Sequence, residues 1–262
     1  FVAGPMIGGL VAGIDTRAPF WVAAVMAACN LVLGLIVLPE SLALSKRRAF
    51  SFKRANPLSS FAAIRNLPGL RTLLMVMFLY ALTFNVWPAI WSYYGKAAFG
   101  WDATWIGISL ALFGLTMAAA QAFLVGPAIK RMGERNTATV GMVVEVANYG
   151  LFGVLTSGFW ALALTPATAL GGLAGPALQA MMSRATPEDQ QGELQGINSS
   201  LNALAMILSP LVMTLIFDYF TSPRTPIYWP GAPFILSATI MVAVVLIFVA
   251  GTREKPSSVP LP

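Results

Sequence analysis

The 262-residue sequence contains no histidine and one cysteine, and only 10% of its residues are charged. The absence of histidine excludes imidazole-based metal sites and catalytic triads. Cys29 has no intrachain partner for a disulfide, and its place in an apolar run makes it a small apolar side chain. Soluble domains carry about 25% charged residues, so this chain lacks the polar surface that a soluble globule needs. We therefore expect no metal, no cofactor and no enzymatic activity.

Apolar residues are abundant instead: they make up 57% of the sequence, and the mean hydropathy is +0.75. They come in blocks close to the ~20 residues that cross ~30 Å of hydrocarbon. The sequence thus predicts an all-α membrane protein, with complete spans at residues 18–38, 70–92, 104–128, 137–157, 160–182, 196–218 and 231–250. Residues 1–10 are already apolar but reach a polar segment at Asp15, so we expect the chain to begin part-way through a helix, as a fragment of a longer protein.

The cations lie in the gaps between these blocks, and nearly all on one side. Residues 39–69, with prolines at both ends and a basic middle, are predicted to be an interhelical linker. Thirteen Lys and Arg residues fall on the side of this linker, and three (Arg17, Lys96 and Arg224) fall on the other. The positive-inside rule places the linker and the C-terminus in the cytoplasm. The net charge of +6 therefore reflects membrane topology and does not predict a nucleic-acid partner.

The stretch from Gly126 to Arg135 is a basic segment between two apolar blocks, and we predict a tight cytoplasmic turn with glycines at positive φ. Its pattern, G-x-x-x-K-R-x-G-E-R, resembles the G-x-x-x-D-R-x-G-R-R loop signature of the major facilitator superfamily. The resemblance implies a gating role for Gly126, Arg131, Gly133 and Arg135, in which the two arginines hold helix ends and facing acids. Lys130 stands where the signature carries an acid.

Other stretches extend the resemblance. Gly4-Pro5-x-x-Gly8-Gly9 resembles the fifth-helix motif of proton-driven exporters, which implies a gating role for these four residues. Segments within residues 101–122, 175–183 and 191–196 resemble the tetracycline-resistance efflux proteins. The resemblance implies a partial facilitator bundle running from about helix five to helix twelve. Its expected parts are the end of an N-terminal half (1–38), a central linker (39–69), a C-terminal six-helix half (70–250) and a disordered tail (251–262).

Glu145 is the sharpest candidate for chemistry. It lies within the predicted span 137–157, which contains no cation. An ionised carboxylate at this depth costs at least a few kcal/mol, so such residues usually have a task. The resemblance also places a functionally important acid here. We predict that Glu145 couples transport to protons. The alternative is a structural role, in which Glu145 reaches the cytoplasmic boundary or hydrogen-bonds a neighbouring helix.

Five amide side chains within the spans are predicted to contact the substrate: Gln121, Asn85, Gln179, Asn198 and Asn202. The alternative for each is a hydrogen bond between helices. The resemblance also implies a histidine four residues before Gln121, where this chain has Met117, so the sequence does not identify tetracycline as the substrate. Trp87, Trp91 and the Tyr93-Tyr94 pair are predicted to form an interfacial belt rather than a drug pocket.

Helix-start signals occur in two gaps. Asp102 is predicted to cap the span that follows it, and Thr186 is predicted to cap a short amphipathic helix beginning at Pro187.

These observations lead to one principal hypothesis and two rivals. The principal hypothesis is a drug:proton antiporter of the inner (plasma) membrane, with a small-molecule substrate, protons and the lipid bilayer as its partners. It requires the missing N-terminal helices for transport, because the cavity lies between two halves. The rivals are a proton-coupled uptake carrier for a sugar or metabolite, and a membrane scaffold that transports nothing.

Overall fold

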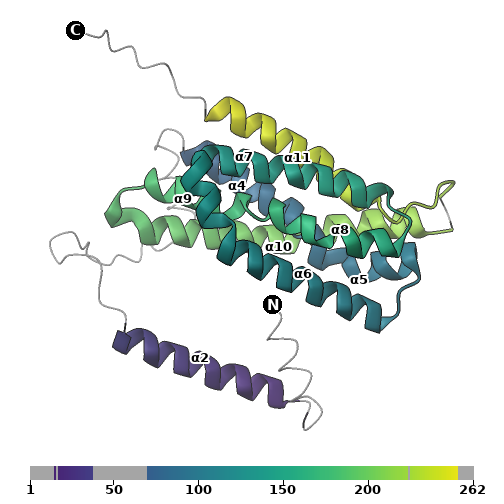
Figure 1. Ribbon diagram of the computed structural model, residues 1–262, viewed down its shortest axis with the longest axis horizontal. Helices are drawn as coiled ribbons and strands as arrows, with labels where there is room; N and C mark the ends of the chain where they lie inside the picture. The colour runs from purple at the N-terminus through teal and green to yellow at the C-terminus, as the bar shows by residue number, and fades with distance from the viewer. Residues whose placement is uncertain (1–14, 16, 38–69, 224, 253–262) are drawn as a thin grey trace. The chain divides into compact units, whose positions relative to one another are not determined.

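The computed structural model describes residues 15, 17–37, 70–223 and 225–252 (Figure 1). By its contacts the chain divides into two units, residues 1–49 and 50–262. The predicted motif at Gly4, Pro5, Gly8 and Gly9 lies outside the described residues, as do the linker 39–69 and the tail from residue 253. The division into two halves of a longer bundle therefore stays a prediction.

The described part of the first unit is a single helix, α2 (Ala18–Val37). It begins beside Asp15, whose Oδ1 accepts a hydrogen bond of 2.9 Å from the Arg17 N–H. Most of its side chains are exposed, including Phe20 and Trp21. A 20-residue, predominantly apolar helix with so little covered surface is typical of one whose surroundings are lipid or other apolar helices.

The second unit contains the remaining described helices. In chain order they are α4 (Leu70–Phe84), α5 (Val86–Phe99), α6 (Ala103–Phe123), α7 (Val125–Val154), α8 (Gly158–Gly171), α9 (Ala174–Arg184), the 3-10 turn η2 (Glu188–Gln190), α10 (Gln191–Thr221) and α11 (Ala232–Gly251). With α2, they make seven helical segments of the described chain that are long and apolar enough to cross a membrane. Each of these segments corresponds to one predicted span, although Val125–Val154 also includes the last residues of the predicted span 104–128, so the predicted number and order of spans are confirmed.

Two of the spans are broken, and in both a proline follows the break. The span Leu70–Phe99 changes from α4 to α5 at Asn85. Pro88 has no N–H to donate, so the carbonyl of Phe84 lacks its helical partner. The span Gly158–Arg184 changes from α8 to α9 at Gly172 and Leu173, just before Pro176. Pro210, by contrast, lies within the continuous 31-residue α10. Prolines therefore mark two of the breaks, but not every intramembrane proline causes one.

The predicted turn from Gly126 to Arg135 is wrong in its extent. Helical hydrogen bonds continue from α6 into α7, because the Leu124 N–H donates to the carbonyl of Ala120 and the Ala128 N–H donates to the carbonyl of Leu124, both at 2.9 Å; Gly126 is therefore helical. Only Gly133 has a positive φ in this stretch, at φ 77° and ψ 164°, and it bends α7. Lys130 and Arg131 thus lie on a helical segment before the bend, and Arg135 lies after it, instead of all three lying in an open loop.

The core contains an aromatic cluster that corrects the predicted belt. Trp87, Trp91 and Tyr94 are 7%, 7% and 1% exposed, and only Tyr93 is open, at 62%. The Trp87 ring lies 5.0 Å from that of Phe152 and also contacts Tyr149, Phe234 and Trp91. Helical periodicity explains the error: residues 87, 91 and 94 share the face of α5 that packs inward, and residue 93 does not.

Hydrogen bonds to backbone carbonyls close one end of the bundle. The Tyr94 hydroxyl donates to the carbonyl of Phe152 at 2.5 Å, and the Trp229 Nε1–H donates to the carbonyl of Gly153 at 2.6 Å. These bonds join α5 and the segment before α11 to the end of α7. Asp102 caps α6 as predicted, because its Oδ1 accepts from the Trp105 N–H at 2.9 Å.

Candidate functional site

Glu145 lies in the middle of α7 and is completely buried, at 0% exposure. Neither of its carboxylate oxygens has a hydrogen-bond partner among the residues that the structure describes. A buried polar group without a partner is costly, and an ionised one far more so. The alternative in which Glu145 reaches the membrane boundary is therefore wrong for this conformation, as is a structural hydrogen bond to a neighbouring helix.

The carboxyl group of Glu145 faces the break between α8 and α9. A Cβ atom added to Gly171, the last residue of α8, would overlap the Glu145 carboxyl group. A Cβ atom on the next residue, Gly172, would lie 2.7 Å from the sulfur of Met117 on α6. The break thus meets α7 on one side and α6 on the other, and it brings Met117 into the neighbourhood of Glu145.

Other residues of α7 hold this helix closely against the broken span. Gly141, one turn before Glu145, faces the backbone of Ala174 so closely that an added Cβ would lie 2.6 Å from its nitrogen. Asn148 is 4% exposed, and its Nδ2 lies 3.5 Å from the carbonyl oxygen of Ala167. Three turns of α7 therefore contact the α8–α9 span, with Glu145 between a glycine and an amide.

The structure brings together three of the predicted substrate residues in an amide ladder between α9 and α10, formed by Gln179, Gln195, Asn198 and Asn202. Gln179 donates to Gln195 Oε1 at 2.9 Å and accepts from Asn198 Nδ2 at 2.8 Å. Asn202 donates to the carbonyl of Asn198 at 3.0 Å. One step further along α9, Gln191 donates to the carbonyl of Ser183 at 2.7 Å. The bonds of Gln179 and Gln191 link α9 to α10, whereas that of Asn202 lies within α10, and each amide retains further donor and acceptor capacity.

The other two predicted substrate residues lie apart from this ladder in the chain. Gln121 is exposed near the end of α6. Asn85 is half-buried at the α4–α5 break, where its Nδ2 donates to the carbonyl of Ala81 at 2.7 Å. The Asn85 side chain thus stabilises the break, because it donates a hydrogen bond to the carbonyl of Ala81, one helical turn earlier.

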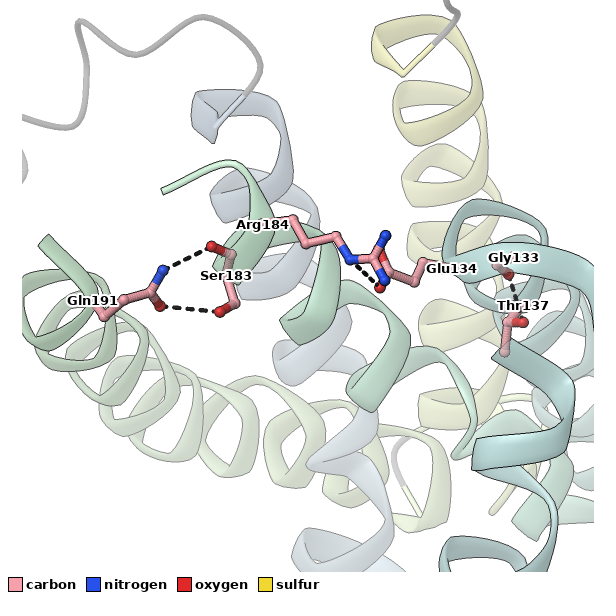
Figure 2. Close-up of polar contacts among 6 residues, drawn as sticks. All are labelled: Gly133, Glu134, Thr137, Ser183, Arg184 and Gln191. Carbon is pink, nitrogen blue, oxygen red and sulfur yellow. Dashed lines mark hydrogen bonds and ion pairs between the residues drawn. The ribbon is translucent and has the colours of Figure 1, made fainter. Parts of the chain in front are cut away.

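Residues of the predicted gating motif form a set of polar contacts at one end of the bundle, which we call the clasp: Glu134 with Arg184, and Arg135 with Thr252. Figure 2 shows the first of these contacts. Glu134, directly after the Gly133 bend, forms an ion pair of 2.9 Å with Arg184 at the end of α9. The Arg135 Nε–H donates to Thr252 Oγ1 at 3.0 Å, at the end of α11. Arg131 is exposed. Arg135 therefore binds a helix end, as predicted. The ion pair of this segment, however, is formed by its acid, Glu134, with an arginine from another helix.

These contacts place the Gly133 bend of α7 and the C-terminal ends of α9 and α11 at the same end of the bundle, as the distribution of cations predicts. The predicted cap at Thr186 is wrong. Its hydroxyl is buried and donates to the carbonyl of Met182 at 2.8 Å, so it completes the end of α9. The chain then passes through the single turn η2 directly into α10, and no separate amphipathic helix forms.

A family model described as the Major Facilitator Superfamily matches residues 72–262. The chain belongs to the major facilitator superfamily. Its fold is similar to that of the human organic anion transporter MFSD10 (TETRAN), with a TM-score of 0.79 and 26% identity over 95% of this chain and 60% of that one. The facilitator fold explains the multi-pass helical bundle and its broken helices.

Among facilitators, the sequence is similar to tetracycline resistance proteins. It is 41% identical to the class C protein of Escherichia coli over 239 residues, which are 91% of this chain and 59% of that protein. It is 35% identical to the class G protein of Vibrio anguillarum over the same shares. The chain thus spans about 60% of the length of these relatives. The names of these relatives describe resistance to tetracycline, and the facilitator superfamily to which the chain belongs is a family of transporters.

Two parts of this site were not predicted from the sequence. The Gly171-Gly172 pair, with Pro176 four residues after Gly172, is a signal for a broken helix that could have been found. The pairing of Glu134 with Arg184 joins residues from different helices, and no local pattern in either segment indicates it.

Proposed function

We propose that this chain is part of a proton-coupled exporter of a small amphipathic drug or metabolite, resident in the inner (plasma) membrane. Its membership in the facilitator superfamily and its similarity to tetracycline resistance proteins support transport and its direction. The single observation that carries proton coupling is the Glu145 carboxyl group, buried in a membrane-length helix with both oxygens unpartnered.

Glu145 takes up a proton in one state of the transporter and releases it in the other. A neutral carboxyl group is tolerated in an apolar environment, whereas the ionised form requires water or donors. The two protonation states therefore favour different conformations, and the proton gradient shifts the population between them. Movement of one helical half against the other then exposes the substrate cavity to each side in turn.

The substrate is held through amide groups. Gln121 is exposed on α6, and Gln195 is the exposed member of the amide ladder on α10. Gln179, Asn198 and Asn202 contribute by orienting Gln195 and through their remaining hydrogen-bond capacity. These groups line one wall of a cavity whose other wall is formed by the N-terminal helices that the longer relatives possess. The chain described here is expected to transport only together with such helices.

The test is accumulation of antibiotics in cells that express the complete protein. A panel of amphipathic antibiotics that includes tetracycline identifies the exported compound, which the wild type keeps low as long as the proton gradient is present. Glu145→Gln is expected to raise accumulation to the level of cells without the protein. Glu193→Gln makes the same chemical change in the first turn of α10 and is expected to export normally. Proton-dependent export that survives in Glu145→Gln would refute the proposed role of Glu145.

A further inference from the structure

The interruption between α8 and α9 presents both kinds of backbone polar group within a membrane span. The last turn of a helix ends in carbonyl groups without helical partners, and the first turn of the next begins with N–H groups without them. At this break the Leu173 N–H still donates to the carbonyl of Leu170, at 3.3 Å, and the Ala177 N–H donates to the carbonyl of Leu173, at 3.4 Å. Pro176 has no N–H, so it cannot donate to the carbonyl of Gly172. The break is therefore a polar spot in an apolar span.

The carboxyl group of Glu145 lies at this spot, in space that exists because residue 171 has no side chain. The other titratable groups that face it are the hydroxyls of Tyr80 on α4 and Tyr149 on α7. A protonated carboxyl group can donate a hydrogen bond, and an ionised one can only accept. The protonated form is suited to the carbonyl groups that end α8, and the ionised form to the N–H groups that begin α9. Both oxygens are unpartnered in this conformation, so either bond remains to be formed by a small movement.

The neighbouring glycines of the same helix pair show that this space is specific. Gly141 also approaches the broken span, but there an added Cβ would meet the backbone of Ala174 and not the carboxyl group. Gly150, on the same helix as Glu145, has no atom within 4 Å of a Cβ position. Of the three, only Gly171 makes room for the carboxyl group itself.

We infer that Gly171 is a positioning residue for proton coupling: its missing side chain seats the Glu145 carboxyl group against the α8–α9 break. The inference rests on the proposed role of Glu145. It extends that role by naming the element on which the carboxyl group acts, since a change in the bonding of Glu145 at the break changes the junction of α8 with α9.

The experiment is a size-compensation cycle in the complete protein, measured by apparent melting temperature in detergent and by proton-driven export across a range of pH. Gly171→Ala is expected to lower the melting temperature by about 4 °C or more and to lower export at least tenfold. Glu145→Asp shortens the acid by one methylene and relieves the overlap. The double variant Gly171→Ala/Glu145→Asp is therefore expected to melt higher than Gly171→Ala alone and to regain the pH profile of Glu145→Asp.

Two controls make the cycle specific. Gly141→Ala is expected to destabilise the protein without rescue by Glu145→Asp, because its overlap is with the Ala174 backbone. Gly150→Ala is expected to behave as the wild type. If Gly171→Ala alone does not assemble, the double variant must still assemble; failure of both overturns the inference.

Equal effects of Glu145→Asp in the Gly171→Ala and Gly141→Ala backgrounds would also overturn the inference. The melting temperatures separate this result from a failure of the proposed function. If Glu145→Gln exports normally, the proposed proton coupling through Glu145 is wrong. A higher melting temperature of the double variant would then show only that residues 171 and 145 are packed together, and the positioning role of Gly171 in coupling would be removed as well. Compensation in the melting temperature together with restoration of the pH profile supports the inference.

Discussion

Glu134 and Arg184 join the bend of α7 to the end of α9 through an ion pair of 2.9 Å (Figure 2). The two side chains differ in environment, since Glu134 is 13% exposed and Arg184 is 78% exposed. The pair therefore joins a largely buried carboxylate to a solvent-exposed guanidinium group. Because α9 is the second half of the broken span, the pair also connects the clasp to the helix that begins beside Glu145.

Reversing this pair tests whether it contributes through charge. Glu134→Gln and Arg184→Gln are each expected to lower export two- to fivefold, with stability losses of no more than about 1 kcal/mol because one partner is solvated. The charge reversal Glu134→Arg/Arg184→Glu is expected to recover most of the export, measured as antibiotic accumulation in cells. Additive losses in the reversed variant would show that the two charges act independently.

The two glycines of the motif are expected to respond differently to alanine. Gly133 has φ 77° and ψ 164°, a region that is essentially restricted to glycine, so Gly133→Ala is expected to cost about 1–3 kcal/mol. Gly126 is helical, with open space around a Cβ position, so Gly126→Ala is expected to be neutral or to stabilise by about 0.5–1 kcal/mol. Melting temperatures in detergent compare the two variants directly. Equal losses at both positions would contradict the bend at Gly133.

The aromatic cluster predicts a large difference between two tryptophans. Trp87→Ala is expected to destabilise the protein by about 3–5 kcal/mol, because it removes a buried ring that contacts four other aromatic side chains. Trp160→Ala serves as the control, since Trp160 is 57% exposed and is expected to change stability by less than about 1 kcal/mol. Similar melting temperatures for the two variants would contradict the burial of Trp87 in the core and favour the predicted interfacial position.

The amide ladder can be tested by separating stability from substrate affinity. Gln179→Leu removes the side chain to which Gln195 and Asn198 are hydrogen-bonded. It is expected to cost about 1–3 kcal/mol of stability, seen as a lower melting temperature. Gln121→Leu removes an exposed amide and is expected to leave stability unchanged while it raises the KM for export. A Gln121→Leu variant with an unchanged KM for every exported compound would remove Gln121 from the substrate site.

The spans were predictable because the hydrophobic block length that crosses a bilayer is fixed by physics. The depth of Glu145 followed from the same reasoning. The environment of that residue did not, because it depends on Gly171 and on a break in another helix. Pattern reasoning misplaced Trp87, Trp91 and Tyr94 for a related reason: composition indicates an aromatic end of a helix, but only packing determines which face turns inward.

The motif from Gly126 to Arg135 shows a second limit. Its glycines and cations predicted a turn, and the bend does occur at Gly133. A helical segment nevertheless extends from Val125, because no residue before Gly133 needs a positive φ. Local signals thus identify where a chain can bend, whereas the tertiary contacts of Glu134 and Arg135 determine what the bend is joined to.

Proton movement by the purified complete protein in lipid vesicles tests the central claim most directly. With a pH-sensitive dye inside the vesicles, addition of an exported compound is expected to drive protons in the opposite direction for the wild type and for Glu193→Gln. Glu145→Gln is expected to give no proton signal while it still binds the compound. Wild-type proton movement in Glu145→Gln would contradict the account.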